Sequence, residues 1–416
     1  MEGKIILPNG VRILTERVPG VRSAALGIWV RTGSRHETAE ENGASHFIEH
    51  MVFKGTEHRS AQDLAEEMDA LGGRINAYTN KESTCFHAHV LDEHLPRTIA
   101  LLSDMLLFPK FADEDVNTER GVVLEEIGMC DDDPDDLCGE RMLRAVFAGS
   151  SLGRPILGEE ATLRQMNGAW LRAYMKRHYL PERVVVALAG SFRDEDVEDL
   201  KRRFSAMAPG EPLVEEPAVY HPAFTFKEKE GEQNHISIAF PSLTNKDPRR
   251  YALRVLNTTL GDGMSSRLWQ EVREKRGLCY SIYSEFVEYE DTGIFGISTS
   301  LSPETEEEAI RTICRVVRDY VEGGVTQAEL DRVRELNKAN ILMSLESTVS
   351  HMGRMSANEL RHGQQKTVEE LLAFYDAVTV EDVQALAREI FDFSRVSLSA
   401  VGHVRTEQEY RTFMGC

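Results

Sequence analysis

The order of predicted elements in the first half of this 416-residue chain starts again in the second half. Each half contains a strand, two helices, a pair of strands and, much later, a closing strand that ends in glycine. The glycines at matching points, Gly55 with Gly261 and Gly190 with Gly402, lie 206 and 212 residues apart. A nearly constant offset over half a chain indicates two copies of one unit. The sequence therefore predicts an α+β protein with two tandem α/β domains, each an antiparallel-rich sheet packed against helices.

Hydrophobic periodicity and turn residues place the individual elements. The first copy opens with a hairpin around the turn Pro8-Asn9-Gly10. Its further predicted strands are 24–30, 74–79, 83–90 and 184–189. The first predicted helix carries the histidines and is capped by Asn42 or Ser45. The later helices are 61–71, 95–107, 113–129, 136–147 and 162–178, with an acidic loop at 131–136. The second copy has predicted strands 236–240, 279–286, 293–301 and 396–401 and helices 251–260 and 266–275.

A boundary between the copies follows from a group of four prolines between Pro209 and Pro222, where helical periodicity is lost. We expect an N-terminal metal-binding domain at 1–212, a linker at 213–222 and a C-terminal domain at 223–416. The second copy has Tyr251-Ala252-Leu253-Arg254-Val255 at the place of the metal motif, so only the first copy can bind a metal in this way.

The motif in the first copy is His46-Phe47-Ile48-Glu49-His50. On a helix the two histidines fall one turn apart on the same face, with Glu49 beside them. The string H-x-x-E-H is the inverted form of a zinc protease motif. Neutral imidazoles bind Zn²⁺ without cancelling its charge, and a carboxylate that is not a ligand accepts the proton of the attacking water. His46 and His50 are therefore predicted ligands of one Zn²⁺ per chain, and Glu49 is the predicted general base.

A catalytic zinc needs a third protein ligand, which the segment from Glu119 to Ile127 supplies. Glu119 and Glu126 are seven residues apart and share a helix face, while Glu125 is rotated by about 100°. We expect Glu126 to be the ligand and Glu119 to be a supporting or alternative carboxylate. Cys130, one turn later, is a rival ligand. His87 and His89 alternate on one strand and are expected to be packed or exposed rather than metal-bound.

Charge and composition exclude several classes of protein. The chain has 69 acidic and 48 basic residues, a net charge of −21. This charge argues against binding of nucleic acid and would attract basic peptides. The alternative is that the acidic excess serves only solubility. No apolar run is long enough for a membrane span, and no secretory signal is recognised. The six cysteines contain no C-x-x-C pair and are expected to be reduced thiols in the cytoplasm.

These motifs together resemble the pitrilysin and mitochondrial processing peptidase family of zinc metallopeptidases. The resemblance rests on His46-x-x-Glu49-His50, on Glu119 and Glu126, and on two strings of the second copy. Those strings are Leu260-Gly261-Asp262-Gly263-Met264-Ser265-Ser266-Arg267-Leu268 and the segment from Glu271 to Tyr280. It runs from about residue 5 to 405, and the chain length is similar to that of the half-size bacterial and mitochondrial branch.

The resemblance implies further roles and partners. Arg273 and Tyr280 would hold substrate carbonyls beside the zinc, and the strand with Asn76 and Ala77 would bind an extended peptide along its edge. Two chains would form a clamshell-type dimer, either a homodimer or a heterodimer with a paralogue. The expected function is a zinc endopeptidase acting on short, unfolded or extended peptides.

Two other classes stay open at this point. One is a non-catalytic structural or chaperone-like subunit of the same family, in which motif residues are usually lost. The other is a non-peptidase zinc hydrolase or lyase, such as an S-ribosylhomocysteinase-like protein, which would use a cysteine ligand. The duplicated domain and the Arg273 and Tyr280 pair argue against the lyase.

Overall fold

The computed structural model describes residues 3–211 and 216–416, which fall into two compact units. The first unit comprises Met1–Ile127, Arg154–Glu216 and Leu342–Thr367, and the second comprises Gly128–Gly153, Pro217–Ile341 and Val368–Cys416. Each unit contains one β-sheet with helices packed on both faces. The predicted α+β class with two sheet-and-helix domains is confirmed.

The sheet of the first unit has six strands in the order β1-β2-β6-β3-β5-β4. β2 and β6 are parallel, and every other neighbouring pair is antiparallel. The bounds are β1 (Gly3–Ile6), β2 (Arg12–Arg17), β3 (Ser23–Val30), β4 (Arg74–Thr79), β5 (Thr84–Leu91) and β6 (Val184–Gly190). β3 and β6 are buried almost throughout, because apolar side chains cover both of their faces.

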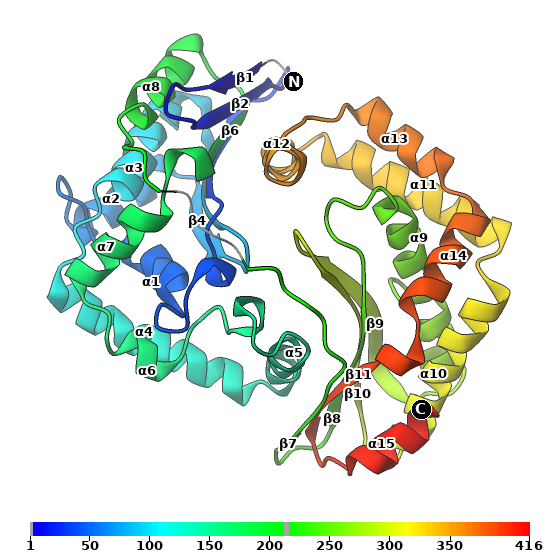
Figure 1. The fold of residues 1–416 in the computed structure, drawn as a ribbon. Coiled ribbons are helices and arrows are strands. Elements are labelled where there is room, and N and C mark those ends of the chain that lie inside the picture. Colours follow the sequence, from blue (N-terminus) through cyan, green and yellow to red (C-terminus); the bar gives the residue numbers. More distant parts are fainter. Residues whose placement is uncertain (1–2, 212–215) are drawn as a thin grey trace. The chain divides into compact units, whose positions relative to one another are not determined.

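Helices of the first half gather on one side of this sheet (Figure 1). They are α1 (Ala44–Met51), α2 (Ala61–Leu71), α3 (Leu95–Leu107), α4 (Asp113–Asp132, which runs into the second unit), α6 (Glu160–Leu163), α7 (Gly168–His178) and α8 (Asp194–Phe204), with short helices at Ser34–His36, Asp92–His94 and Pro181–Arg183. Their apolar faces bury Leu26, Ile28 and Phe86 of the sheet in one large core. This core fixes α1, the helix with the histidine motif.

The opposite face of the same sheet carries one helix from the second half of the chain, α12 (Thr348–His362). Its Met352 and Met355 pack against Trp29. At its C-terminal end the carboxylate of Glu359, almost fully buried, lies 2.8 Å from the Lys4 ammonium. Apolar packing and this ion pair bind α12 to the first unit.

The second unit repeats the plan with five strands in the order β7-β11-β8-β10-β9. The strands of its sheet are β7 (Phe224–Glu228), β8 (Asn234–Pro241), β9 (Cys279–Glu288), β10 (Gly293–Leu301) and β11 (Ser397–Gly402). The helices are α5 (Pro134–Val146), α9 (Arg250–Leu260), the π-helical η5 (Trp269–Glu274), α10 (Glu306–Gly323), α11 (Gln327–Ser344), α13 (Val368–Ala377), α14 (Val380–Ile390) and α15 (Glu407–Met414). Short helices lie at Ser151–Gly153 and Phe393–Arg395. Here too only one pair, β7 with β11, is parallel. The predicted repeat of strand, two helices, hairpin and closing strand is therefore confirmed.

Three predictions about local structure are wrong. The acidic segment 131–136 is not a loop, because α4 continues to Asp132 and the Asp133 carboxylate accepts hydrogen bonds from the first backbone N–H groups of α5. The helix predicted at 162–178 is two helices, since the Asn167 side chain caps a new start at Gly168. Within the helix predicted at 266–275, Trp269–Glu274 form a π-helix rather than a regular α-helix.

The compact units do not coincide with two continuous halves. α5 belongs to the first half in sequence, yet it packs on β11 and β8 of the second sheet, and α12 makes the reciprocal exchange onto β6 and β3. Of the expected linker at 213–222, residues 213–215 lie outside the described residues, and 216–222 are in neither helix nor strand. Among the described helices, none has the length and apolar run that crossing a bilayer requires.

Candidate metal and catalytic site

The site begins on α1, whose one-turn spacing places His46 and His50 side by side. Their ring centroids are 4.6 Å apart, and the ring planes are inclined by 59°. His46 is 7% exposed, because the core of the first unit surrounds it. Two imidazoles therefore face the same small volume at the edge of that core.

The third group comes from α4. One Glu126 carboxylate oxygen lies 3.7 Å from Nε2 of His46 and 3.5 Å from Nε2 of His50. Ligand atoms at ordinary zinc distances of about 2.0–2.2 Å in a tetrahedron are about 3.3 Å apart, so the observed spacings suit Zn²⁺. Among the described residues these three form the only group of histidine, cysteine and carboxylate side chains close enough to hold a metal; Cys130, His87 and His89 are not part of it.

Glu119 lies behind the ligand group rather than within it. Its carboxylate is 2.9 Å from Nδ1 of His50 and 2.7 Å from the Lys54 ammonium. A carboxylate on the second ring nitrogen orients an imidazole and leaves its Nε2 free for a metal. Nδ1 of His46, by contrast, is buried without a hydrogen-bond partner in the described structure. Only one of the two imidazoles is thus braced by a carboxylate.

Glu49 lies near His50 and Glu126 and is held by a residue at the end of strand β4. The Thr79 hydroxyl donates a 2.6 Å hydrogen bond to one of its carboxylate oxygens. Burial raises the pKa of Glu49, although the Thr79 hydrogen bond and the nearby His50 oppose the shift. A carboxylate held in one direction and made more basic by burial is suited to accept a proton.

Burial also lowers the pKa of His46 to about 3, with His50 adding to the shift. The imidazole is therefore neutral at physiological pH. A neutral ring keeps the lone pair that a metal needs, whereas a protonated ring cannot bind one. The lowered pKa of His46 therefore agrees with the role of metal ligand that its place beside His50 and Glu126 indicates.

The start of α1 is stabilised in a way that the sequence does not reveal. The N-cap residue is Gly43, which provides no side chain, so the predicted capping by Asn42 or Ser45 is wrong. The buried Glu37 carboxylate instead accepts 2.8 Å hydrogen bonds from the backbone N–H groups of Gly43 and Ser45. The Asn42 amide donates to the same carboxylate. One acidic side chain thus accepts from two of the backbone donors at the start of the helix that holds the histidines.

Replacing Glu37 with Ala is expected to lower the free energy of unfolding by about 2–4 kcal/mol, because it removes a charged cap and leaves buried N–H groups without acceptors. Urea unfolding followed by circular dichroism measures the change. Glu37→Gln, which keeps one acceptor, serves as the control with an intermediate loss. Equal unfolding midpoints for Glu37→Ala and the unmodified chain would exclude this role.

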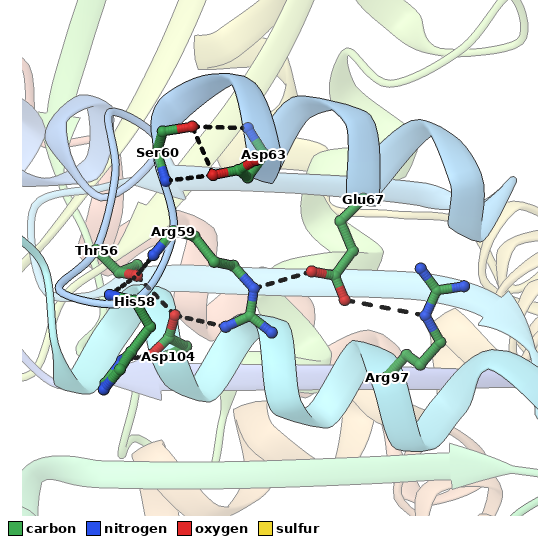
Figure 2. A network of polar contacts seen from close by, with 8 residues as sticks. All are labelled: Thr56, His58, Arg59, Ser60, Asp63, Glu67, Arg97 and Asp104. Carbon is green, nitrogen blue, oxygen red and sulfur yellow. Dashed lines mark hydrogen bonds and ion pairs between the residues drawn. The ribbon is translucent and has the colours of Figure 1, made fainter.

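The loop after α1 is anchored to α3 by the buried Asp104, as Figure 2 shows. Its carboxylate accepts hydrogen bonds from Thr56 at 2.7 Å and Arg59 at 2.6 Å, and it lies 2.6 Å from Nδ1 of His58. Arg59 also donates to Glu67 of α2. Lys54, which pairs with Glu119, directly precedes this loop. The Asp104 network therefore fixes the end of the chain segment that runs from His50 through Lys54.

Asp104→Asn is expected to lower the free energy of unfolding near pH 7 by about 2–3 kcal/mol, since it leaves Arg59 facing a neutral amide. Burial opposes ionisation of Asp104, but hydrogen bonds from Thr56, His58 and Arg59 outweigh it and hold its pKa below the usual range. The contribution is therefore present above about pH 4 and is lost as the pH falls through the depressed value. Urea unfolding from pH 7 to 3 should show the difference from the unmodified chain shrinking. A constant difference would contradict this account.

Asn76 and Ala77 lie on β4, which is the edge strand of the first sheet. Asn76 is exposed, and its side-chain oxygen accepts a hydrogen bond from the Ala77 backbone N–H at 2.9 Å. That N–H is therefore not used in pairing with β5. An open edge of this kind is able to pair with an added strand.

Arg273 and Tyr280 belong to the second unit, on η5 and β9. The Arg273 guanidinium lies 3.9 Å from the ring centre of Trp269 and 5.7 Å from that of Tyr280. Tyr280 is 79% exposed, which is unusual for so large a side chain. The structure groups these residues on one exposed surface, and Trp269, one helical turn before Arg273, is the neighbour that sequence reasoning missed.

Three residues near the motif were also missed: Glu37, Lys54 and Thr79. Lys54 had a usable signal, because it follows His50 by four residues. Thr79 and Glu37 reach the motif from a strand and a preceding loop. No local spacing relates them to α1.

Two family models match the chain. Residues 12–160 match the model described as insulinase (peptidase family M16), and residues 166–337 match the model described as the peptidase M16 inactive domain. The first region contains the inverted motif together with Glu119 and Glu126 of α4. The second begins within the first unit and continues through most of the second.

Relatives with similar sequences span nearly the whole chain. An uncharacterized zinc protease of Bacillus subtilis, YmxG, is 42% identical over 95% of this chain and 98% of its own. One of Streptomyces coelicolor, SCO5738, is 40% identical over 97% and 90%. A solved protease structure from Helicobacter pylori has a TM-score of 0.90 with 19% identity, covering 96% of this chain and 99% of that one, which shows a shared fold. The chain thus belongs to peptidase family M16, with both the N-terminal and the C-terminal domain of that family.

Proposed function

We propose that this protein is a zinc-dependent endopeptidase that cleaves short, unfolded or extended peptides. The observation that carries the proposal is the meeting of His46, His50 and Glu126, with their ligand atoms within 4.8 Å of one another, beside a carboxylate that is not part of the group. The names of the relatives, zinc proteases, support the same coarse activity.

The roles of individual residues follow from their positions. When bound by His46, His50 and Glu126, Zn²⁺ would polarise a peptide carbonyl and acidify an attacking water. Glu49 accepts the proton of that water and passes it to the leaving amine. Thr79 keeps the Glu49 carboxylate in one orientation. Glu119 orients the His50 ring and is itself paired with Lys54.

Substrate contacts are proposed at two places. The open edge of β4, with Asn76 and Ala77, receives the peptide as an added strand, a mode that binds main chain and therefore requires an extended substrate. Arg273 and Tyr280, grouped on the second unit, hold substrate carbonyls. The large exposed fraction of Tyr280 supports a role in contact with a ligand.

The proposed assembly is a dimer, formed by two copies of this chain or by this chain and a paralogue without the motif. Light scattering after gel filtration, for the chain alone and mixed with such a paralogue, distinguishes the two. The proposed location is the cytoplasm, supported by six free cysteines.

Removing the metal provides the direct test. The zinc-loaded protein is expected to cleave a quenched fluorescent peptide and to lose this activity in a chelator, and one equivalent of Zn²⁺ should restore it. Cleavage that persists in chelator, with the metal shown to be absent, would refute the proposal. A metal-bound protein that cleaves no peptide in a broad library would instead favour a non-catalytic subunit or another zinc hydrolase.

A further inference from the structure

The edge strand β4 has two faces, and only one of them is turned toward α1. Hydrogen-bonded positions alternate in an antiparallel pair. The Ala77 N–H donates to the Asn76 side chain rather than to β5, which implies that Ile75 and Thr79 also turn their backbone groups to the open edge. The side chains of Ile75 and Ala77 pack against the core that surrounds α1. Those of Arg74, Asn76 and Tyr78 point to the opposite face and are exposed.

The strand register identifies the rest of that second face. Directly paired residues share a face, and β4 and β5 pair Arg74 with His89 and Asn76 with His87. The Tyr78 and His87 rings are 6.1 Å apart, and the Trp29 N–H donates a 3.1 Å hydrogen bond to the Tyr78 hydroxyl. Two histidines, an arginine, an amide and the Tyr78 ring therefore lie together next to the open edge, with the buried Trp29 behind Tyr78.

This surface has an unusual charge for the chain that carries it. The protein has a net charge of −21, yet the six positions at which β4 and β5 pair on this face, of which Cys85 is buried, include no carboxylate. They are Arg74, Asn76, Tyr78, Cys85, His87 and His89. Arg74 makes no ion pair with any residue that the structure describes, so its charge is available to a ligand. Burial lowers the pKa of His87, which makes this ring a neutral hydrogen-bonding group.

We propose that this second face of β4 selects acidic side chains at alternating positions of the bound peptide, with Arg74 as the main determinant. A peptide strand added to β4 places every second side chain on this face, about 5 Å from the side chain opposite it. Arg74 lies five residues from Thr79, or about 16 Å along the strand, so the selected positions lie several residues from the bond that is cleaved.

This inference deepens the proposed function and rests on it for the mode of peptide binding. It also differs from the expectation for basic peptides, which was drawn from net charge alone. The local surface, rather than the total charge, meets the side chains of a bound peptide. A charge about 16 Å along the strand from Thr79, which holds the Glu49 carboxylate, acts on binding more than on the chemical step.

Binding measured without turnover tests the inference. Three blocked peptides of about eight residues share a neutral, extended sequence and carry Thr, Asp or Lys at every second position. Fluorescence anisotropy gives their Kd for zinc-loaded Glu49→Gln protein, and for the same protein with Arg74→Glu, with the milder Arg74→Gln, or with Lys176→Glu. The last is a control of equal charge change at an exposed lysine of α7.

The Asp peptide is expected to bind about fivefold more tightly than the Lys peptide. The reason is that an Asp side chain gains an exposed ion pair with Arg74, whereas a Lys side chain would meet a like charge. Arg74→Gln should remove this preference, Arg74→Glu should reverse it, and Lys176→Glu should leave it intact. Equal or tighter binding of the Lys peptide to Glu49→Gln protein, no binding of any peptide, or a preference unaltered by both Arg74 variants would overturn the inference. The proposed function is tested separately: it fails when zinc-loaded protein with Glu49 intact cleaves no peptide in a broad library, whatever the binding of these three peptides.

Discussion

Glu49→Gln is expected to slow peptide cleavage by about 100-fold to 10,000-fold while leaving one zinc per chain. The substitution keeps the size of the side chain and its oxygen for the Thr79 hydroxyl, but it removes the group that accepts a proton. Glu49 is not among the three side chains that converge as a ligand group, so metal binding should not depend on it. Steady-state cleavage of a fluorescent peptide and metal analysis of the same sample measure both quantities.

Thr79→Val is the matched control for this result. It removes only the hydroxyl that orients Glu49, so the rate should fall by about tenfold, as for one hydrogen bond to a charged group. Zinc content should again be unchanged. Full activity in Glu49→Gln would exclude the proposed base, and a loss of zinc in that variant would place Glu49 among the ligands.

Elements with a clear local signal were predicted closely. Helix α2 begins after a Ser60 cap and ends before Gly72, and both signals are written in the sequence. The hairpin of β1 and β2 and the buried strands β3 and β6 follow from turn residues and apolar runs. The predictions failed at two capping residues: Asp133 starts α5 where a loop was expected, and Asn167 starts α7 inside a predicted helix.

The exchange of α5 and α12 between the units had no local signal. Each is an amphipathic helix, and its sequence shows that one face is buried but not which sheet buries it. Met352 and Met355 would suit either sheet by hydrophobicity alone. The choice depends on shape and on single ion pairs such as Lys4 with Glu359, which join residues 355 positions apart.

The residues of the candidate site show the same difference between local and tertiary signals. His46, Glu49 and His50 lie on one helix and Glu126 on another, so helical spacing was enough to bring them into one prediction. Thr79 and Glu37 come from a strand end and a loop, and only the folded chain relates them to α1. Local periodicity thus identifies groups on one element, while the groups that orient them depend on tertiary structure.

Three of the glutamates of α4, Glu119, Glu125 and Glu126, are expected to differ in their effect on zinc affinity when each is changed to Gln. Glu126→Gln removes the carboxylate that lies within 3.7 Å of both histidine rings, so zinc should be lost in dialysis. Glu119→Gln removes the negative charge behind His50, the one of the two ligand imidazoles that a second carboxylate braces, and should weaken zinc binding by about 10-fold to 100-fold. Glu125→Gln, on an exposed face of the same helix, is the matched control and should bind zinc normally. Competition with a chromogenic chelator gives the three affinities; normal binding by Glu126→Gln, or a stronger effect of Glu119→Gln, would reverse the assigned roles.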